Sequence, residues 1–147
     1  MKNIILCLSM VFCFRASYAQ TDQKEQSFKN ITLNAGIDTA FDKTANYIQA
    51  SDMFILAMDK QAGFIQAKVF EKNRKMISAK RGERKTYNFI LRPLDDKTTV
   101  SLNIYVEDYL FGGEVQSRSY YYEEKGISKN ERDYRAILKA LQDAVQE

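Results

Sequence analysis

Apolar and polar residues alternate strictly between residues 99 and 107, which is the pattern of a β-strand with one buried face. The buried face would consist of Val100, Leu102, Ile104 and Val106. Residues 85–94 predict the strand before it, with Tyr87, Phe89 and Leu91 on one face. Pro93 ends that strand, because proline has no N–H to donate to a neighbouring strand.

An earlier stretch, DMFILAMDKQAGFIQAKVF, predicts a β-hairpin. Residues 53–58 form a continuous apolar run, which is typical of a short strand buried on both faces. The turn after this run ends at Gly63, a residue that can supply a positive φ. Apolar and polar residues then alternate from residue 64 to residue 70, with Ile65, Ala67 and Val69 on one face.

Two amphipathic helices are predicted, one before these strands in the sequence and one after them. In the first, from about residue 38 to 50, apolar residues recur at helical spacing and Asn34 or Asp38 would cap the N-terminus. In the second, from about residue 129 to 145, an apolar stripe follows the capping box that begins at Ser128.

The element order predicts an α+β fold in residues 31–147, a single domain. Helix, three or four antiparallel strands, a weaker strand at Tyr120 to Tyr122 and a closing helix give an antiparallel sheet of four or five strands. Because alternating strands need one face covered, we expect a two-layer sandwich with the N- and C-terminal helices packed on one face.

The sheet face opposite the helices is one candidate interaction surface. The alternation predicts four large apolar residues on it, Phe64, Phe70, Ile90 and Tyr105. A contiguous exposed patch of this kind marks a protein partner or a homodimer. Since residues 53–58 are apolar on both faces, the alternative that this face is covered stays open.

Part of the chain resembles the small BamC-like or TBP-like domains of bacterial envelope proteins. The part in question consists of DMFILAMDKQAGFIQAKV, the basic segment after it and RKTYNFILRPLDDKTTVSLNIYV. The resemblance covers roughly residues 36 to 145 and rests on the apolar strand, the Asp-to-Gly turn and the alternating fourth strand. It implies an envelope module that binds or assembles, with no catalytic motif. Many members are lipoproteins, whereas neither Cys7 nor Cys13 has the setting of a lipidated cysteine.

The N-terminal residues predict the cellular location of the protein. Residues 1–19 combine an early lysine, an apolar core and a small-x-small end, which predicts a secretory signal peptide cleaved after Ala19. The apolar stretch of residues 4–14 is short for a retained membrane anchor, so no transmembrane span is expected after cleavage. Residues 20–30 are polar and predict a flexible leader. We therefore expect export to the periplasm or the extracellular space.

Charge concentrates in one place. After loss of the signal, 20 basic and 19 acidic residues remain, yet residues 72–85 hold seven basic residues against one acidic residue. We interpret this segment as a solvated loop and a speculative binding site for an anionic envelope surface; nucleic acid is not expected as a partner of an exported protein. Its basic residues are Lys72, Arg74, Lys75, Lys80, Arg81, Arg84 and Lys85.

The residues that most chemistries need are missing. The chain has no histidine, and both cysteines lie in the signal peptide, so histidine or thiolate catalysis and zinc binding are excluded. Three pairs of adjacent carboxylates occur, at residues 95–96, 107–108 and 123–124. The two members of each pair would point to opposite faces of a strand or lie in a turn, which makes a carboxylate-dependent hydrolase remote. No catalytic residue, metal site or cofactor is predicted.

Two function classes remain. The first is an exported, non-catalytic binding or assembly module of the bacterial cell envelope that acts through the open sheet face, the basic loop or both. The second is a secreted inhibitor or immunity-type protein that inserts the loop 72–85 into an enzyme. A charged loop of this kind would steer association more than it would add affinity.

Overall fold

The computed structural model describes residues 28–75, 77–112 and 119–146. The elements in chain order are β1 (Asn30–Leu33), α2 (Ile37–Ala50), β2 (Phe54–Asp59), β3 (Phe64–Lys72), β4 (Lys80–Leu94), β5 (Lys97–Phe111), β6 (Tyr120–Ile127) and α3 (Glu131–Gln146). No helix in these ranges is long and apolar enough to cross a membrane.

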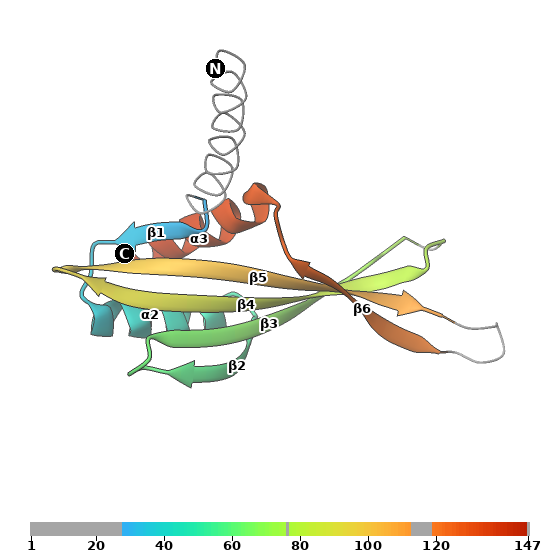
Figure 1. The fold of residues 1–147 in the computed structure, drawn as a ribbon, viewed down its shortest axis with the longest axis horizontal. Helices are drawn as coiled ribbons and strands as arrows, with labels where there is room; N and C mark the ends of the chain where they lie inside the picture. Colours follow the sequence, from blue (N-terminus) through green and yellow to red (C-terminus); the bar gives the residue numbers. More distant parts are fainter. Residues whose placement is uncertain (1–27, 76, 113–118, 147) are drawn as a thin grey trace, which may run out of the picture.

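One antiparallel sheet holds all six strands of the described chain, in the order β1-β5-β4-β3-β2, with β6 also pairing with β5. The centre is the β4–β5 hairpin, whose strands are 15 residues long each. β1 and β6 lie along the same edge of β5 but at opposite ends, with β1 opposite Thr98–Ser101 and β6 opposite Tyr105–Phe111 (Figure 1).

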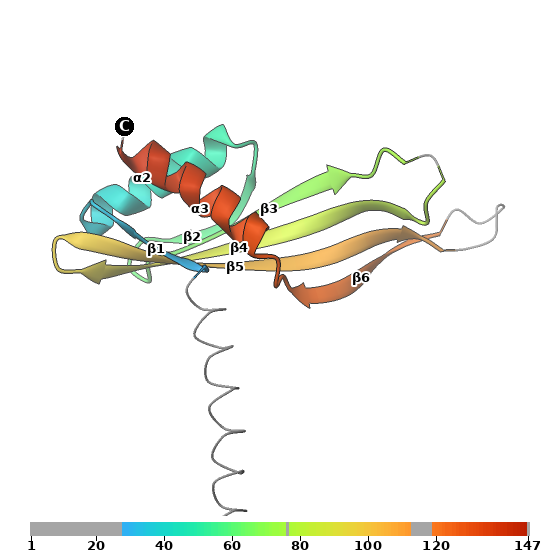
Figure 2. The same cartoon turned by 90° about the horizontal axis from the view of Figure 1, so that it is seen from above.

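Both helices pack on one face of the sheet and cover only one end of it (Figure 2). The buried core lies between them and the sheet, and the alternating residues predicted for β3, β4 and β5 face it. Beyond the helices the sheet continues as a twisted extension that we call the arm (Figures 1 and 2). The arm consists of residues 69–72, 80–86, 105–111 and 120–127.

The predicted fold class is confirmed as α+β, with both helices on one face. The sheet is larger than expected, with six strands rather than four or five. One of the added strands is the short stretch at Ile31 and Leu33, which pairs with β5. The weak strand expected at Tyr120 to Tyr122 continues to Ile127.

The expectation that residues 53–58 form a strand buried on both faces is wrong. β2 is the edge strand of the sheet, and Phe54, Leu56 and Met58 are 64%, 42% and 52% exposed. A register shift between Ile55 and Ala57 interrupts its pairing with β3. The apolar run therefore forms an exposed edge.

Of the local predictions, the one for the turn at Gly63 agrees with the structure, whereas those for the helix N-caps do not. Gly63 has φ +61°, as the hairpin turn requires, and a Cβ there would lie 2.3 Å from the Leu91 carbonyl oxygen. The N-cap of α2 is Gly36, without a side-chain cap, so neither Asn34 nor Asp38 has the predicted role. In α3 the capping side chain is Asn130, which accepts from the Arg132 N–H, rather than the predicted Ser128.

Candidate functional site: an aromatic face on the arm

Aromatic rings gather on the arm, on the sheet face opposite the helices. Tyr109 lies at their centre, with ring centroids 5.7 Å from Phe70, 5.3 Å from Tyr120 and 4.9 Å from Tyr122. Phe111 continues the cluster, 5.4 Å from Tyr120. We call these five residues the aromatic face.

Strand register explains why these residues meet. Side chains two apart on a strand share a face, so Tyr109 and Phe111 point the same way on β5. β6 places Tyr122 opposite Tyr109 and Tyr120 opposite Phe111. Directly opposed residues on neighbouring strands have their Cβ atoms about 5 Å apart, which lets aromatic pairs pack in contact.

Two arginines flank the rings. The Arg84 guanidinium lies 3.9 Å from the centroid of Tyr122 and donates two hydrogen bonds to the Glu107 carboxylate, at 2.6 and 2.5 Å. These hydrogen bonds raise the pKa of Arg84 and lower that of Glu107, because each group stabilises the charged form of the other. Arg81 lies 5.6 Å from the Phe111 ring. The cationic groups thus add cation–π contacts to the cluster.

A glycine lies beneath one of the rings. Gly82 is buried in β4, and a Cβ at this position would lie 2.3 Å from the Phe70 ring and 2.9 Å from the Glu71 carbonyl oxygen. Gly82 therefore does not lie in a loop, in contrast to the interpretation of residues 72–85 as a solvated loop. It is a strand residue opposite Lys72, beside a register shift, and its missing side chain makes room for Phe70.

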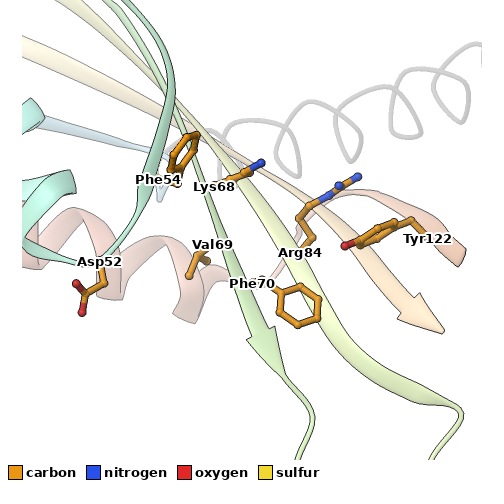
Figure 3. A pocket seen from close by; sticks show the side chains of 7 residues that line it. All are labelled: Asp52, Phe54, Lys68, Val69, Phe70, Arg84 and Tyr122. Atoms are coloured by element: carbon orange, nitrogen blue, oxygen red, sulfur yellow. The ribbon is translucent and has the colours of Figure 1, made fainter. Parts of the chain in front are cut away.

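A groove of about 420 Å³ begins at this ring. Figure 3 shows Phe70, Arg84 and Tyr122 at one side of the groove and Phe54 with Lys68 at its upper end, while Asp52 lies on the opposite side from Arg84. The Lys68 ammonium is 5.2 Å from the Phe54 ring centroid. The groove thus combines exposed rings with positive charge.

The basic segment 72–85 is not one loop. Lys72 ends β3, four of the basic residues belong to β4, and only residues 73–79 connect the two strands. Arg74 and Lys75 lie in this connection and are exposed. The expectation of a single solvated loop is wrong because the strands of the long hairpin include half of the segment, residue 72 and residues 80–85.

Several of these cations are already paired across strands. Lys80 contacts Asp108 at 2.5 Å, and Lys85 contacts Glu71 at 3.2 Å. Arg84 binds Glu107 in the same way, so three of the seven basic side chains of residues 72–85 bind carboxylates that lie outside this segment. The positive charge available to an anionic surface is correspondingly smaller.

The four residues predicted on the open sheet face lie on that face, but they do not form one patch. Phe64 and Ile90 are opposite each other at the end of the sheet away from the arm. A polar row, in which the Gln66 side chain donates to Asn88 at 2.7 Å, separates them from the arm. Phe70 joins the aromatic face. Tyr105 lies at the start of the arm, where its hydroxyl bonds Glu124 and its pKa is raised in consequence.

Sequence reasoning missed the centre of the cluster. Tyr109 and Phe111 lie on the strand face of the polar residues Thr99, Ser101 and Asn103, so they interrupt the alternation of residues 99–107, a signal that was present in the sequence but was not used. The run Tyr120 to Tyr122 was interpreted as an ordinary strand. Its two outer tyrosines belong to the aromatic face, while Tyr121 is opposite Leu110 on the other face.

Carboxylates in the described ranges do not assemble into a reactive site. Glu107 and Asp108 point to opposite faces, the first bound to Arg84 and the second to Lys80. Within residues 28–75, 77–112 and 119–146, no group of three or more acidic side chains could hold a metal ion.

Comparisons with known proteins are sparse. The sequence matches no family model and no curated protein. Among solved structures, the fold is similar to a DUF4468 family protein from Bacteroides ovatus, with 10% sequence identity, a TM-score of 0.47, and coverage of 81% of this chain and 84% of that one.

Proposed function

We propose that this protein is an exported, non-catalytic binding or assembly module of the bacterial cell envelope, and that the aromatic face of the arm is its binding surface. The observation that carries the proposal is the exposure of ordered rings. Phe70, Tyr120 and Tyr122 are 46%, 45% and 42% exposed, although they pack against one another.

Such a surface suits recognition. Tyrosine and arginine are enriched where proteins bind each other, because they combine large contact area with polar groups. The ring contacts and the Arg84–Glu107 pair fix these side chains before a partner arrives, which lowers the entropy lost on binding. The arm also projects past the helices, so a partner can approach it without touching them (Figure 2).

Two kinds of observation support a non-catalytic role. The chain has no histidine, and its cysteines lie outside the expected mature protein. Three acidic residues of the arm, Glu71, Glu107 and Asp108, bind lysine or arginine. Arg84 lowers the pKa of Glu107, which disfavours this carboxylate as a proton donor. The inhibitor alternative receives less support, since half of its proposed loop belongs to strands and three of its seven basic residues are bound to carboxylates.

The test uses two tyrosines from the same strand. The purified exported chain is cross-linked to an envelope extract of its source cells, and the captured proteins are quantified by mass spectrometry. Tyr122→Ala should reduce the specific captures at least about fivefold, as expected for a hot-spot aromatic. Tyr121→Ala is the matched control, because Tyr121 is equally exposed on the opposite face and should leave capture unchanged.

Equal capture by the two variants would contradict the proposal. Sedimentation of the purified chain decides whether the partner is a second copy. A dimer that dissociates in Tyr122→Ala and persists in Tyr121→Ala would place the homodimer contact on the aromatic face.

A further inference from the structure

β3 extends further along the sheet than β2, its neighbour at the outer edge. β2 pairs with β3 only from Phe64 to Lys68, whereas β4 pairs with β3 as far as Lys72. Over the described residues, Val69–Lys72 therefore has a strand on one side only. Figure 3 shows the chain turning away from β3 before Phe54, toward Asp52, so the preceding residues leave this edge open.

The ladder pattern identifies which backbone groups face the open edge. The Leu91 N–H donates to the Gly63 carbonyl and the Asn73 N–H donates to the Arg81 carbonyl, so residues 63 and 73 bond toward β4. Antiparallel strands alternate the side to which successive residues bond. The N–H and C=O groups of Phe70 and Lys72 therefore point to the open edge, next to the groove.

Charge around this edge is mainly positive, with Asp52 as the carboxylate on the opposite side of the groove. Lys68 and Lys72 lie on either side of Phe70 on the same face of β3, and Arg74 follows in the connection. None of these three makes an ion pair with another described residue. Glu71, the acid within this stretch, lies on the other face and is bound to Lys85.

This pattern separates the possible occupants. A second copy adding its own β3 edge would bring lysine against lysine, which is the arrangement that protects edge strands from self-association. An acidic segment would meet opposite charge instead. Phe54 and Phe70, 64% and 46% exposed, border the groove where an apolar side chain of that segment would pack.

We propose that the open edge of β3 at Phe70 and Lys72 binds an extended acidic segment of a partner protein as an added β-strand. This inference rests on the proposed function and names the chemistry of the partner. Backbone hydrogen bonds would supply affinity, and the groove together with the lysines would select alternating apolar and acidic side chains. The open stretch of four residues is about 13 Å long, enough for about four residues of the added strand.

The probe is a fluorescein-labelled octapeptide in which valine alternates with glutamate, measured by fluorescence anisotropy against the purified exported chain. Two peptides serve as controls: one alternates valine with lysine, and one keeps the glutamates but replaces two valines with proline. We expect the valine–glutamate peptide to bind and both controls to bind at least about tenfold more weakly.

Two substitutions at one position separate charge from strand addition. Lys72→Thr removes the charge and keeps the edge-facing N–H, whereas Lys72→Pro removes both. The first should weaken binding about threefold, and the second at least about tenfold beyond that. Lys72 is the last residue of β3 and is exposed, and circular dichroism with thermal unfolding verifies that each variant is folded.

A measurement on the unaltered chain keeps the test independent of the variants. Saturating peptide should slow hydrogen exchange at the Phe70 and Lys72 amides. Absence of binding, equal binding by the lysine peptide, equal affinity of the two Lys72 variants, or unchanged exchange at Phe70 would overturn the proposal. If these tests fail while envelope capture still depends on Tyr122, the proposed function stands and strand addition is wrong.

Discussion

Tyr134 of α3 connects the helix layer to the root of the arm. Its fully buried hydroxyl donates to the Ser128 carbonyl at 2.9 Å and accepts from the Ile104 N–H at 3.3 Å. Tyr134→Phe keeps the ring and leaves two backbone groups without this partner. Since an unsatisfied buried polar group costs about 1–3 kcal/mol, we expect the free energy of unfolding to fall by about 1.5–3 kcal/mol.

Urea unfolding followed by circular dichroism measures this loss, which should lower the midpoint by on the order of 1 M for a domain of this size. Tyr47→Phe is the matched control, because its half-buried hydroxyl donates to the Ile137 carbonyl over 3.4 Å and should contribute about 0.5 kcal/mol or less. Equal losses in the two variants would refute the view that the Tyr134 hydroxyl holds β5 and the β6–α3 connection together.

Three further predictions concern the turn at Gly63, the Arg84–Glu107 ion pair and the removal of the signal peptide. Gly63→Ala should cost at least about 2 kcal/mol in urea unfolding, because φ is positive and a Cβ would meet a β4 carbonyl, while Gly36→Ala should cost less than about 0.5 kcal/mol. Arg84 lowers the pKa of Glu107, so the stability from this pair is present above the ordinary pKa near 4.3 and is lost as pH falls below it; Glu107→Gln should flatten that loss by about 1 kcal/mol. When the full chain is expressed in its source cells, the intact mass of the recovered protein should correspond to a chain that begins at Gln20.

Each of these has a result that would contradict it. Equal costs at the two glycines would show that the left-handed conformation is not needed in the turn. For the ion pair, Glu123→Gln is the control, since Glu123 is 49% exposed beside Lys125 and this exposed pair should contribute little to the free energy of unfolding. A mass that retains residues 1–19 would mean that the signal segment is not removed.

The parts of the fold that were predicted correctly are those governed by a single buried face. Val100, Leu102 and Ile104 are fully buried, and the polar residues between them face away from the helices. Strict alternation has this outcome whatever the neighbouring strands are, because successive side chains point to opposite faces. The hairpin at Gly63 was predictable for a similar reason, since its positive φ is a local requirement.

The errors concern features decided by distant residues. An apolar run has the same composition in a central strand and in an edge strand, so residues 53–58 alone could not reveal that β2 has a neighbour on one side only. Likewise, the charge density of residues 72–85 suggested a solvated loop because Asp108 and Glu107, which bind Lys80 and Arg84 across the strands, lie more than 20 residues away on β5. Only strand pairing brings these charges together.

The arm follows from a difference in length between the helices and the central strands. At 1.5 Å per residue, the 14 and 16 residues of α2 and α3 span about 21 and 24 Å, whereas 15 residues of β5 span about 50 Å. Two helices lying on one face cannot cover such a strand from end to end. In its last third, Tyr109 and Phe111 point to the face opposite the helices, so their rings can pack only on neighbouring strands or on a partner, and the sequence marks them by placing large rings where the polar residues of the alternation would continue.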